Sequence, residues 1–411
     1  MKTTLLPQLS LSEVNVPQFT EVPRTILCCQ NYLLKHRVCQ LNKEFIFRLS
    51  VLLLTFLSYT CYHASRKPIS IIKNSREFLD CSQDPRFCHS WITEIDGAPE
   101  DEAKTIMGLL DTSYLVSYAV FMFVSGFVAE RVDLRLFLSL GMFLSGVSTI
   151  MFGAGYFLGV HSIWYLVMVQ VVSGVVQTTG WPGVVTVMAN WFGKGKRGLI
   201  MGLWNSHTSL GNILGALIAG ACVNDNWGLS FTWPGVLMIM SAVLIYLFLV
   251  PEPSIVGLQP PKQHKSPLDS PLPSTTNLLE SEKSLLRTHS SSRLTDSAYN
   301  SENDDVVASS KSNKPISFCA ALRIPGVVEF SLCLFFAKLV SYTFLFWLPN
   351  YISSTSGLDA KSSAKLSTFF DVGGIIGGII AGVVSDRSGM SASTCAVIID
   401  FKYINNHLCL L

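Results

Sequence analysis

The chain alternates long apolar runs with shorter polar segments. An apolar run of about 20 residues is long enough for a helix to cross the hydrocarbon core of a bilayer. Runs of this kind predict spanning helices over residues 45–64, 107–129, 134–158, 164–191, 199–223, 231–250, 327–351 and 366–384. Pro182 falls inside the fourth helix and predicts a kink there. The pattern is that of an all-α membrane protein.

A long polar segment divides these helices into two groups. Residues 251–323 are rich in Ser, Pro, Lys and Glu, with little that could form a core, so we expect a disordered linker. A tail over residues 1–44 and a six-helix half over residues 45–250 precede it. Residues 324–411 form a second, incomplete half, because the stretch after Thr394 carries Asp400 and Lys402 and is a poor spanning helix. This organisation is typical of a two-domain transporter.

Composition places the chain in lipid and argues against several classes of function. Only 14% of the residues are charged, against about 25% in a soluble domain, and the mean hydropathy is +0.41. The net charge of +2 offers no basic surface to a nucleic acid. The sequence contains no phosphate-binding loop, metalloprotease motif or Cys/His cluster with zinc spacing. We therefore expect neither an enzyme nor a bound metal or cofactor.

The basic residues of the loops predict the orientation in the membrane. Lys and Arg are enriched before the first helix, in the second–third and fourth–fifth loops, and in the linker, whereas residues 159–163 and 224–230 contain none. Because positive loops stay in the cytosol, the N-terminus and the 251–323 linker are predicted to be cytosolic. The loop after the first helix is then lumenal, where Cys81 and Cys88 are either two free thiols or a disulfide.

A charged motif follows the second predicted helix and recurs after the eighth. The first copy consists of Gly126, Glu130, Arg131 and Arg135. Its glycine allows two helices to approach, and its glutamate can pair with an arginine or face the positive N-terminus of a neighbouring helix. The second copy consists of Gly382, Asp386 and Arg387, with Ser391 in place of the last arginine. The motif resembles the signature of the major facilitator superfamily, which implies a cytosolic gate; the alternative is an ordinary set of loop cations.

A second cluster of ionisable residues ends the first predicted helix, where His63 is followed by Arg66 and Lys67. The cluster lies on the lumenal side, which should be poor in positive charge. Arginine suits phosphate because its planar guanidinium donates two parallel hydrogen bonds and stays charged. We therefore interpret the cluster as a phosphate site, with a pair of interfacial cations as the alternative.

Several longer runs resemble one family of transporters. They cover residues 62–71, 177–182, 190–197, 204–211 and 337–349. These runs are similar to the sugar-phosphate exchangers of solute carrier family 37, which belong to the organophosphate:phosphate antiporter group of the major facilitator superfamily. The resemblance extends over roughly residues 45–395 apart from the linker. It implies the major facilitator superfamily transporter fold, with about eight or nine of its twelve helices in this chain, in the endoplasmic reticulum membrane.

The resemblance also implies substrates and the residues that bind them. Members of the group clamp phosphate between an arginine of helix 1 and a cation of helix 7. Arg66 matches the first, and Lys338 lies one turn before the second, where this chain has Ser341. His207 on helix 5 is one residue from a histidine of the bacterial relatives and is a further candidate. We expect exchange of glucose 6-phosphate or a related sugar phosphate for inorganic phosphate by alternating access. The alternatives are a truncated, non-transporting form and a facilitator for another organic anion.

Two ridges of glycine mark the fifth and eighth predicted helices. Gly211 and Gly215 lie on the fifth, and Gly374, Gly378 and Gly382 lie on the eighth. Such ridges let helices pack closely. In the superfamily that the chain resembles, these two helices meet between the halves, so we expect the ridges to face each other. Ordinary helix packing is the alternative.

Overall fold

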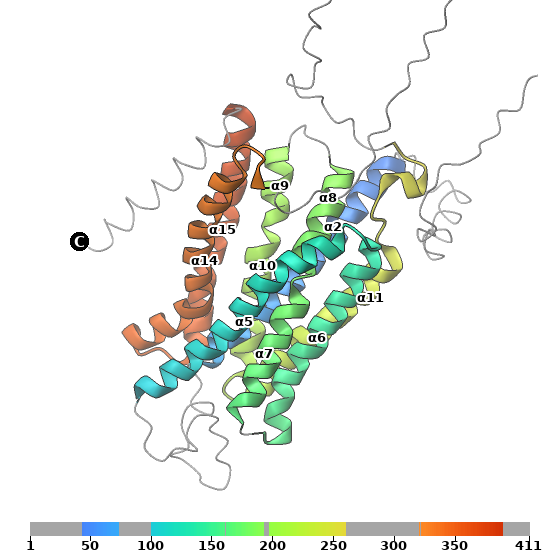
Figure 1. The fold of residues 1–411 in the computed structure, drawn as a ribbon. Helices are drawn as coiled ribbons and strands as arrows, with labels where there is room; N and C mark the ends of the chain where they lie inside the picture. Colours follow the sequence, from blue (N-terminus) through green and yellow to red (C-terminus); the bar gives the residue numbers. More distant parts are fainter. Residues whose placement is uncertain are drawn as a thin grey trace, which may run out of the picture. The chain divides into compact units, whose positions relative to one another are not determined.

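The computed structural model describes residues 43–73, 100–160, 162–192, 197–259, 320 and 322–388 (Figure 1). Its elements are α2 (Lys43–Arg66), α3 (Pro68–Ile72), α5 (Glu100–Ala129), α6 (Leu134–Leu158), α7 (Ile163–Gln177), α8 (Gly180–Trp191), α9 (Arg197–Asn205), α10 (His207–Cys222), α11 (Trp227–Phe248), η1 (Pro253–Val256), α14 (Val327–Ser356) and α15 (Ala360–Ser388). Residues 1–261 and 332–411 form one unit and residues 262–331 another, and every contact discussed below lies within the first. Cys81 and Cys88 lie outside the described residues, as does most of the predicted tail and linker.

Every predicted spanning segment is helical, with ends that differ by several residues from the prediction. Among the described residues, seven helices are long and apolar enough to cross a membrane. The segment predicted over residues 199–223 is divided at Ser206 into α9 and α10, so neither piece reaches that length alone. The first helix runs further than predicted, because α3 continues directly from α2 as far as Ile72.

Prolines explain where two of these helices are divided. Pro68 occupies the first turn of α3, where its missing N–H costs nothing. Pro182 leaves the carbonyl of Thr178, four residues earlier, without a helical donor. The break between α7 and α8 falls at that point, and the Ser125 hydroxyl of α5 donates to the Thr178 carbonyl at 2.9 Å instead. The kink predicted from Pro182 therefore lies just before the proline.

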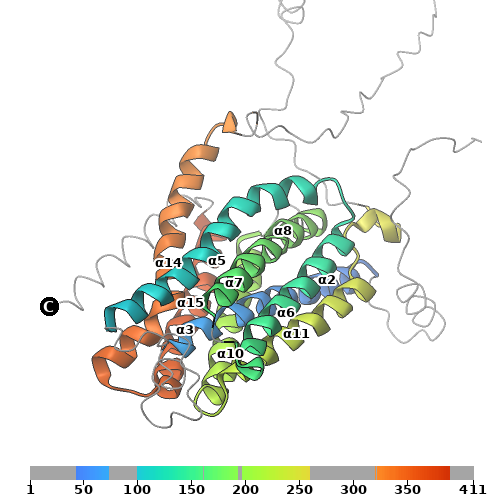
Figure 2. The same cartoon turned by 60° about the horizontal axis from the view of Figure 1, so that its bottom comes forward.

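Helix α6 packs against α11 along its length, and the two helices lie side by side in both views (Figures 1 and 2). Glycines allow this close approach. A Cβ atom built on Gly146 would lie 2.8 Å from the Gly235 carbonyl oxygen, and one built on Gly235 would lie 2.8 Å from that of Gly146. The two backbones are therefore too close for a larger residue at either position.

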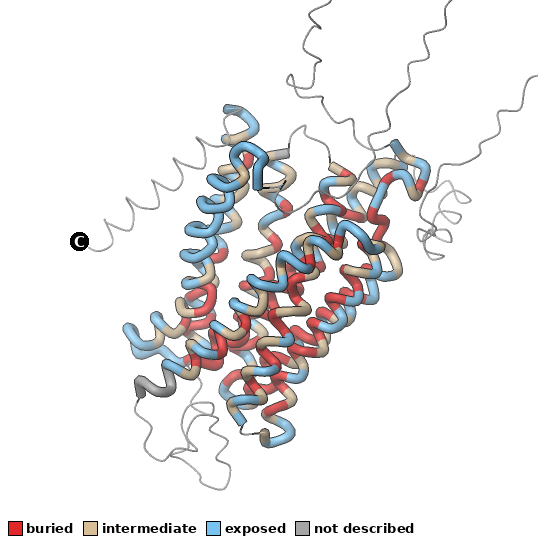
Figure 3. The backbone as a smooth tube through the Cα atoms, viewed as in Figure 1, coloured by how far each residue is buried: buried red, intermediate tan, exposed pale blue. Residues whose placement is uncertain are grey.

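The α2–α3 pair runs through the most buried part of this unit (Figure 3). All residues from 58 to 73 are buried, including several that carry charge. Helices α10, α11 and α8 all pack against α2, which explains this burial. Charged side chains enclosed in this way need partners, or a ligand, to offset the cost of leaving water.

The first residues of the predicted linker are folded. The ammonium of Lys43 donates to the Val256 carbonyl at 2.8 Å, and the indole N–H of Trp191 donates to the Val250 carbonyl at 2.8 Å. Val256 is buried in the same apolar cluster as Trp191. The boundary placed at residue 251 was therefore wrong by several residues, because buried Pro253 and Val256 anchor the start of this polar segment.

Candidate functional site

Arg66, at the end of α2, is a buried cation with few partners. Its side chain is enclosed, since the residue is 4% exposed. Its Nε donates to the Gln177 Oε1 atom at 2.7 Å, and its Nη1 donates to the Tyr342 hydroxyl at 3.4 Å. Its Nη2 is buried without a hydrogen-bond partner. No ion pair among the described residues includes Arg66, so its charge has no counterion in this part of the chain.

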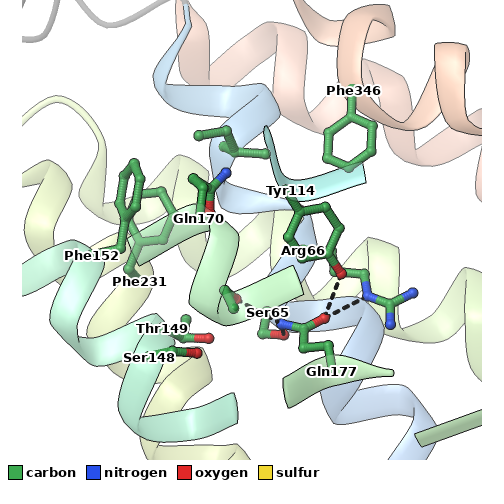
Figure 4. A pocket seen from close by; sticks show the side chains of 12 residues that line it. Ser65, Arg66, Tyr114, Ser148, Thr149, Phe152, Gln170, Gln177, Phe231 and Phe346 are labelled. Carbon is green, nitrogen blue, oxygen red and sulfur yellow. Dashed lines mark hydrogen bonds between the residues drawn. The ribbon is translucent and has the colours of Figure 1, made fainter. Parts of the chain in front are cut away.

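Tyrosines and one amide surround the guanidinium. Its Cζ lies 5.0 Å from the centre of the Tyr118 ring. The Tyr114 hydroxyl donates to the Gln177 Oε1 atom at 2.7 Å, so this oxygen accepts from Tyr114 and Arg66 at once (Figure 4). Two donors that converge on one oxygen are what a phosphate oxygen requires. We interpret the Gln177 amide oxygen as occupying the position of a substrate oxygen.

A small cavity with both polar and aromatic walls opens beside this contact. Arg66, Tyr114 and Gln177 lie at one end of it, and Ser148, Thr149 and Gln170 line the other (Figure 4). The cavity measures about 20 Å³, which is room for about one water molecule. In this conformation the site is therefore closed around its own side chains.

A second buried network joins α2, α10 and α15. The Nδ1 atom of His63 lies 3.3 Å from the Asn212 Oδ1 atom, and the Asn212 amide donates to Asp371 at 2.8 Å. The charge of Asp371 acts in turn on Lys67, whose ammonium donates to the Leu345 carbonyl at 3.3 Å. Three predicted site residues, His63, Arg66 and Lys67, are thus neither exposed nor at an interface. They are buried because the helix continues through α3.

Lys338 does not contact Arg66 in this structure. It is exposed on α14, and Tyr342, one turn later on the same helix face, reaches the guanidinium instead. The role of Lys338 in binding substrate stays a prediction.

His207 lies in an aromatic cluster. It is fully buried, with its ring centre 4.5 Å from that of Trp204 and 4.7 Å from that of Tyr59. Its Nδ1 atom lies 3.2 Å from the Thr208 hydroxyl, and its Nε2 atom is buried without a partner. It does not line the cavity beside Arg66.

The first copy of the charged motif makes only local contacts among the described residues. Glu130 and Arg131 are exposed and 3.7 Å apart. Arg131 also donates to the Phe127 carbonyl at 2.6 Å, and the Arg135 guanidinium lies 5.9 Å from the Tyr246 ring centre. A Cβ atom on Gly126 would meet nothing within 4 Å. The prediction that Gly126 brings two helices together is wrong here, because its face of α5 has no close neighbour.

The second copy makes the contact that was predicted for the first. The Asp386 carboxylate accepts from the backbone N–H groups of Gly198 at 2.8 Å and Leu199 at 2.7 Å, at the start of α9. The negative charge thus lies at the positive end of a helix. Arg387 is exposed beside it.

The glycine ridges pair differently from the prediction. Gly211 and Gly215 lie against the α2 backbone and not against α15. Two glycines of the α15 ridge, Gly378 and Gly382, are met instead by α9, where a Cβ atom on Gly202 would lie 2.8 Å from the Gly378 carbonyl oxygen. The third, Gly374, faces α10, where its Cβ atom would lie 2.9 Å from the Ser209 hydroxyl. The helix break at Ser206 explains the difference, because α9 and α10 can then present separate faces to separate neighbours.

Replacing Asp386 by alanine should lower the thermal stability of the purified protein, because two N–H groups of α9 lose their acceptor. Loss of such a cap costs about 0.5–2 kcal/mol. Melting in detergent measures the effect, and Glu130→Ala is the matched control. Glu130 is exposed with one weak ion pair, so its loss should change little. Equal effects of the two substitutions would contradict the capping role.

Comparison with known proteins decides the family. The model of the Major Facilitator Superfamily matches residues 98–399. The glucose-6-phosphate exchanger SLC37A2 of Mus musculus is 49% identical over 378 residues, which cover 87% of this chain and 71% of that protein, and the values for Homo sapiens are the same. The glucose-6-phosphate exchanger SLC37A1 of Mus musculus is 43% identical over 401 residues, covering 88% and 73%. The chain belongs to the major facilitator superfamily, in the family of these exchangers.

One solved structure supports the fold. The crystal structure of a bacterial homolog of the human lysosomal transporter Spinster, inward-facing and unoccupied, gives a TM-score of 0.51 at 15% identity. The match covers 83% of this chain and 63% of that chain. The predicted fold class and the predicted family are therefore confirmed: the chain is a multi-pass membrane transporter of the major facilitator superfamily.

Sequence reasoning singled out Arg66, but not Gln177 and Tyr342, which contact it, nor Asp371 of the neighbouring network. Gln177 and Asp371 are polar residues inside apolar helices, and such residues are candidates for a functional site by default. That signal was available in the sequence. Tyr342 gave none, because a tyrosine in a membrane helix is as common at a packing position as at a site.

Proposed function

We propose that this transporter exchanges glucose 6-phosphate, or a related sugar phosphate, for inorganic phosphate across the endoplasmic reticulum membrane. Its relatives are named as glucose-6-phosphate exchangers, which supports the substrate class. We further propose that the N-terminus and the linker face the cytosol, as the loop charges predict.

One observation carries the proposal: Arg66 is buried, has no carboxylate partner among the described residues, and keeps one nitrogen free. A buried cation of this kind costs free energy until an anion arrives. A phosphate that displaces the Gln177 oxygen would accept from Arg66 and Tyr114 and would also reach the free Nη2. Both substrates carry that phosphate group, which explains why they would compete for one site.

Obligatory exchange follows from the same charge. The cavity is too small for a sugar phosphate, so the helices around it must separate to admit one. If the empty site returned through the closed state, the positive charges of Arg66, Lys67 and Lys338 would be without a bound anion. Binding of either phosphate compound compensates that charge, so movement is favoured only when the site is loaded.

Purified protein in liposomes tests this function. Liposomes preloaded with inorganic phosphate should take up labelled glucose 6-phosphate, whereas liposomes without internal phosphate should not. External inorganic phosphate should compete with the label, and external glucose should not. Uptake that is independent of internal phosphate would favour a facilitator, and absence of uptake under all conditions would contradict the proposal.

A further inference from the structure

Lys73, just after α3, is a buried lysine outside the Arg66 site. It is 2% exposed and forms an ion pair with Asp111 of α5. Its ammonium also donates to the Phe346 carbonyl at 3.3 Å and lies 4.0 Å from the centre of the Trp347 ring. One ammonium therefore contacts the first half through Asp111 and the second half through α14.

A proline explains why α14 offers the Leu345 carbonyl at this point. Pro349 lies inside α14 and has no N–H to donate to the Leu345 carbonyl, four residues earlier. The Lys67 ammonium donates to that carbonyl at 3.3 Å, and Lys73 binds the next one along. The Thr178 carbonyl, released in the same way by Pro182, is taken by Ser125.

These contacts close one end of the bundle next to the candidate site. Phe346 lines the cavity together with Ile69 of α3, which is 3% exposed. The lysines that hold Leu345 and Phe346 therefore keep α14 against the cavity from the side where α3 ends. A separate contact of the second half with the first, at Asp386, involves the C-terminal end of α15.

We propose that Lys67 and Lys73 form a gate with the Leu345 and Phe346 carbonyls beside Pro349, and that Asp111 keeps Lys73 neutralised while α14 moves away. Lys73 and Asp111 both belong to the first half, so their ion pair survives opening. The Asp111 Oδ1 atom is buried without a partner and can accept the N–H that leaves Phe346. For Lys73, opening then breaks the hydrogen bond to Phe346 and the cation–π contact with Trp347, while the ion pair with Asp111 keeps the ammonium neutralised.

Thiol labelling reads the gate directly. The full chain, with its own cysteines replaced and Ile69→Cys added, is placed in lipid nanodiscs without substrate. The labelling rate with a charged thiol reagent reports how often the cavity opens. Lys73→Met should raise this rate by roughly tenfold or more, since the closed state loses a hydrogen bond from a charged donor. Pro349→Ala should raise it as well, because the restored N–H takes the Leu345 carbonyl from Lys67.

Asp111→Asn should have the opposite effect. The open state then leaves the Lys73 ammonium without Asp111, its one counterion among the described residues, whereas the closed state keeps the Phe346 carbonyl and the Trp347 ring. The labelling rate should fall. A purely structural role of the ion pair would instead loosen the protein and raise the rate in both single variants.

Two matched controls separate the gate from general loosening. Lys43→Met removes a lysine–carbonyl hydrogen bond within the first half, and Pro182→Ala restores a helical hydrogen bond within the first half. Neither should change labelling at position 69.

A raised labelling rate at position 69 is the result that supports the gate. If Lys73→Met does not elute as a folded protein in gel filtration, the labelling rate of Pro349→Ala is used in its place. Unchanged labelling in a folded Lys73→Met or Pro349→Ala protein overturns the gate. The gate serves the exchange proposed above, but the assay uses no substrate, so either proposal can fail alone.

Discussion

Substitution of Arg66 by alanine should abolish exchange of phosphate for glucose 6-phosphate. Arg66 is the buried cation with a free nitrogen at the candidate site, and it provides the only charge within hydrogen-bonding distance of the Gln177 oxygen among the described residues. Each hydrogen bond from a charged donor contributes about 1.5–3 kcal/mol. Loss of two such bonds to a bound phosphate should reduce uptake by roughly a hundredfold or more. Uptake of labelled glucose 6-phosphate into phosphate-loaded liposomes measures the effect.

Two further arginine variants make this result specific. Arg66→Lys keeps the charge but loses the planar fork that donates two parallel hydrogen bonds, so it should recover only part of the activity. Arg48→Ala is the matched control, because Arg48 lies on the same helix in a partly exposed ion pair with Glu44 at 2.6 Å. Surface pairs contribute little, so this variant should exchange like the parent. Parental uptake by a folded Arg66→Ala protein would exclude the arginine as the phosphate ligand.

Substitution of Gln177 by glutamate should block the site with an internal anion. The carboxylate would accept from Arg66 and Tyr114 in place of the amide oxygen, which now lies 2.7 Å from each donor. Phosphate must then displace a charged competitor and not a neutral one. The KM for external phosphate should rise roughly tenfold to a hundredfold, by the difference between a charged and a neutral acceptor. The purified variant should also melt at a higher temperature, because Arg66 gains a counterion.

Gln177→Met should change both measurements in the opposite direction. Methionine has a similar length but offers no strong acceptor, so Arg66 and Tyr114 would lose their shared partner. The empty protein should then melt at a lower temperature, and phosphate should bind with a lower KM because nothing competes for the guanidinium. A Gln177→Glu variant with an unchanged KM would show that phosphate does not occupy the position of the amide oxygen.

The positions of the helices in the described part of the chain could be predicted from the sequence. Lipid cannot satisfy backbone polar groups, so each apolar run of sufficient length must be helical. The 134–158 prediction matches α6 residue for residue, and the predicted 107–129 helix ends where α5 ends. The candidate role of Arg66 also came from the chain itself, because it is one of two adjacent cations on the predicted lumenal side, which should be poor in positive charge.

The sequence determined which segments span the membrane, which family they form, and that Arg66 is a candidate for anion binding. Only the tertiary structure decided which side chains meet: Tyr342 and Gln177 at Arg66, Lys67 and Lys73 on the carbonyls near Pro349, and Asp386 on α9. The physical reason is that in a membrane both the lipid-facing and the buried side of a helix are apolar, so the hydrophobic pattern does not fix how the helix is rotated about its axis. Successive residues point in directions about 100° apart, so a small rotation exchanges one neighbour for another.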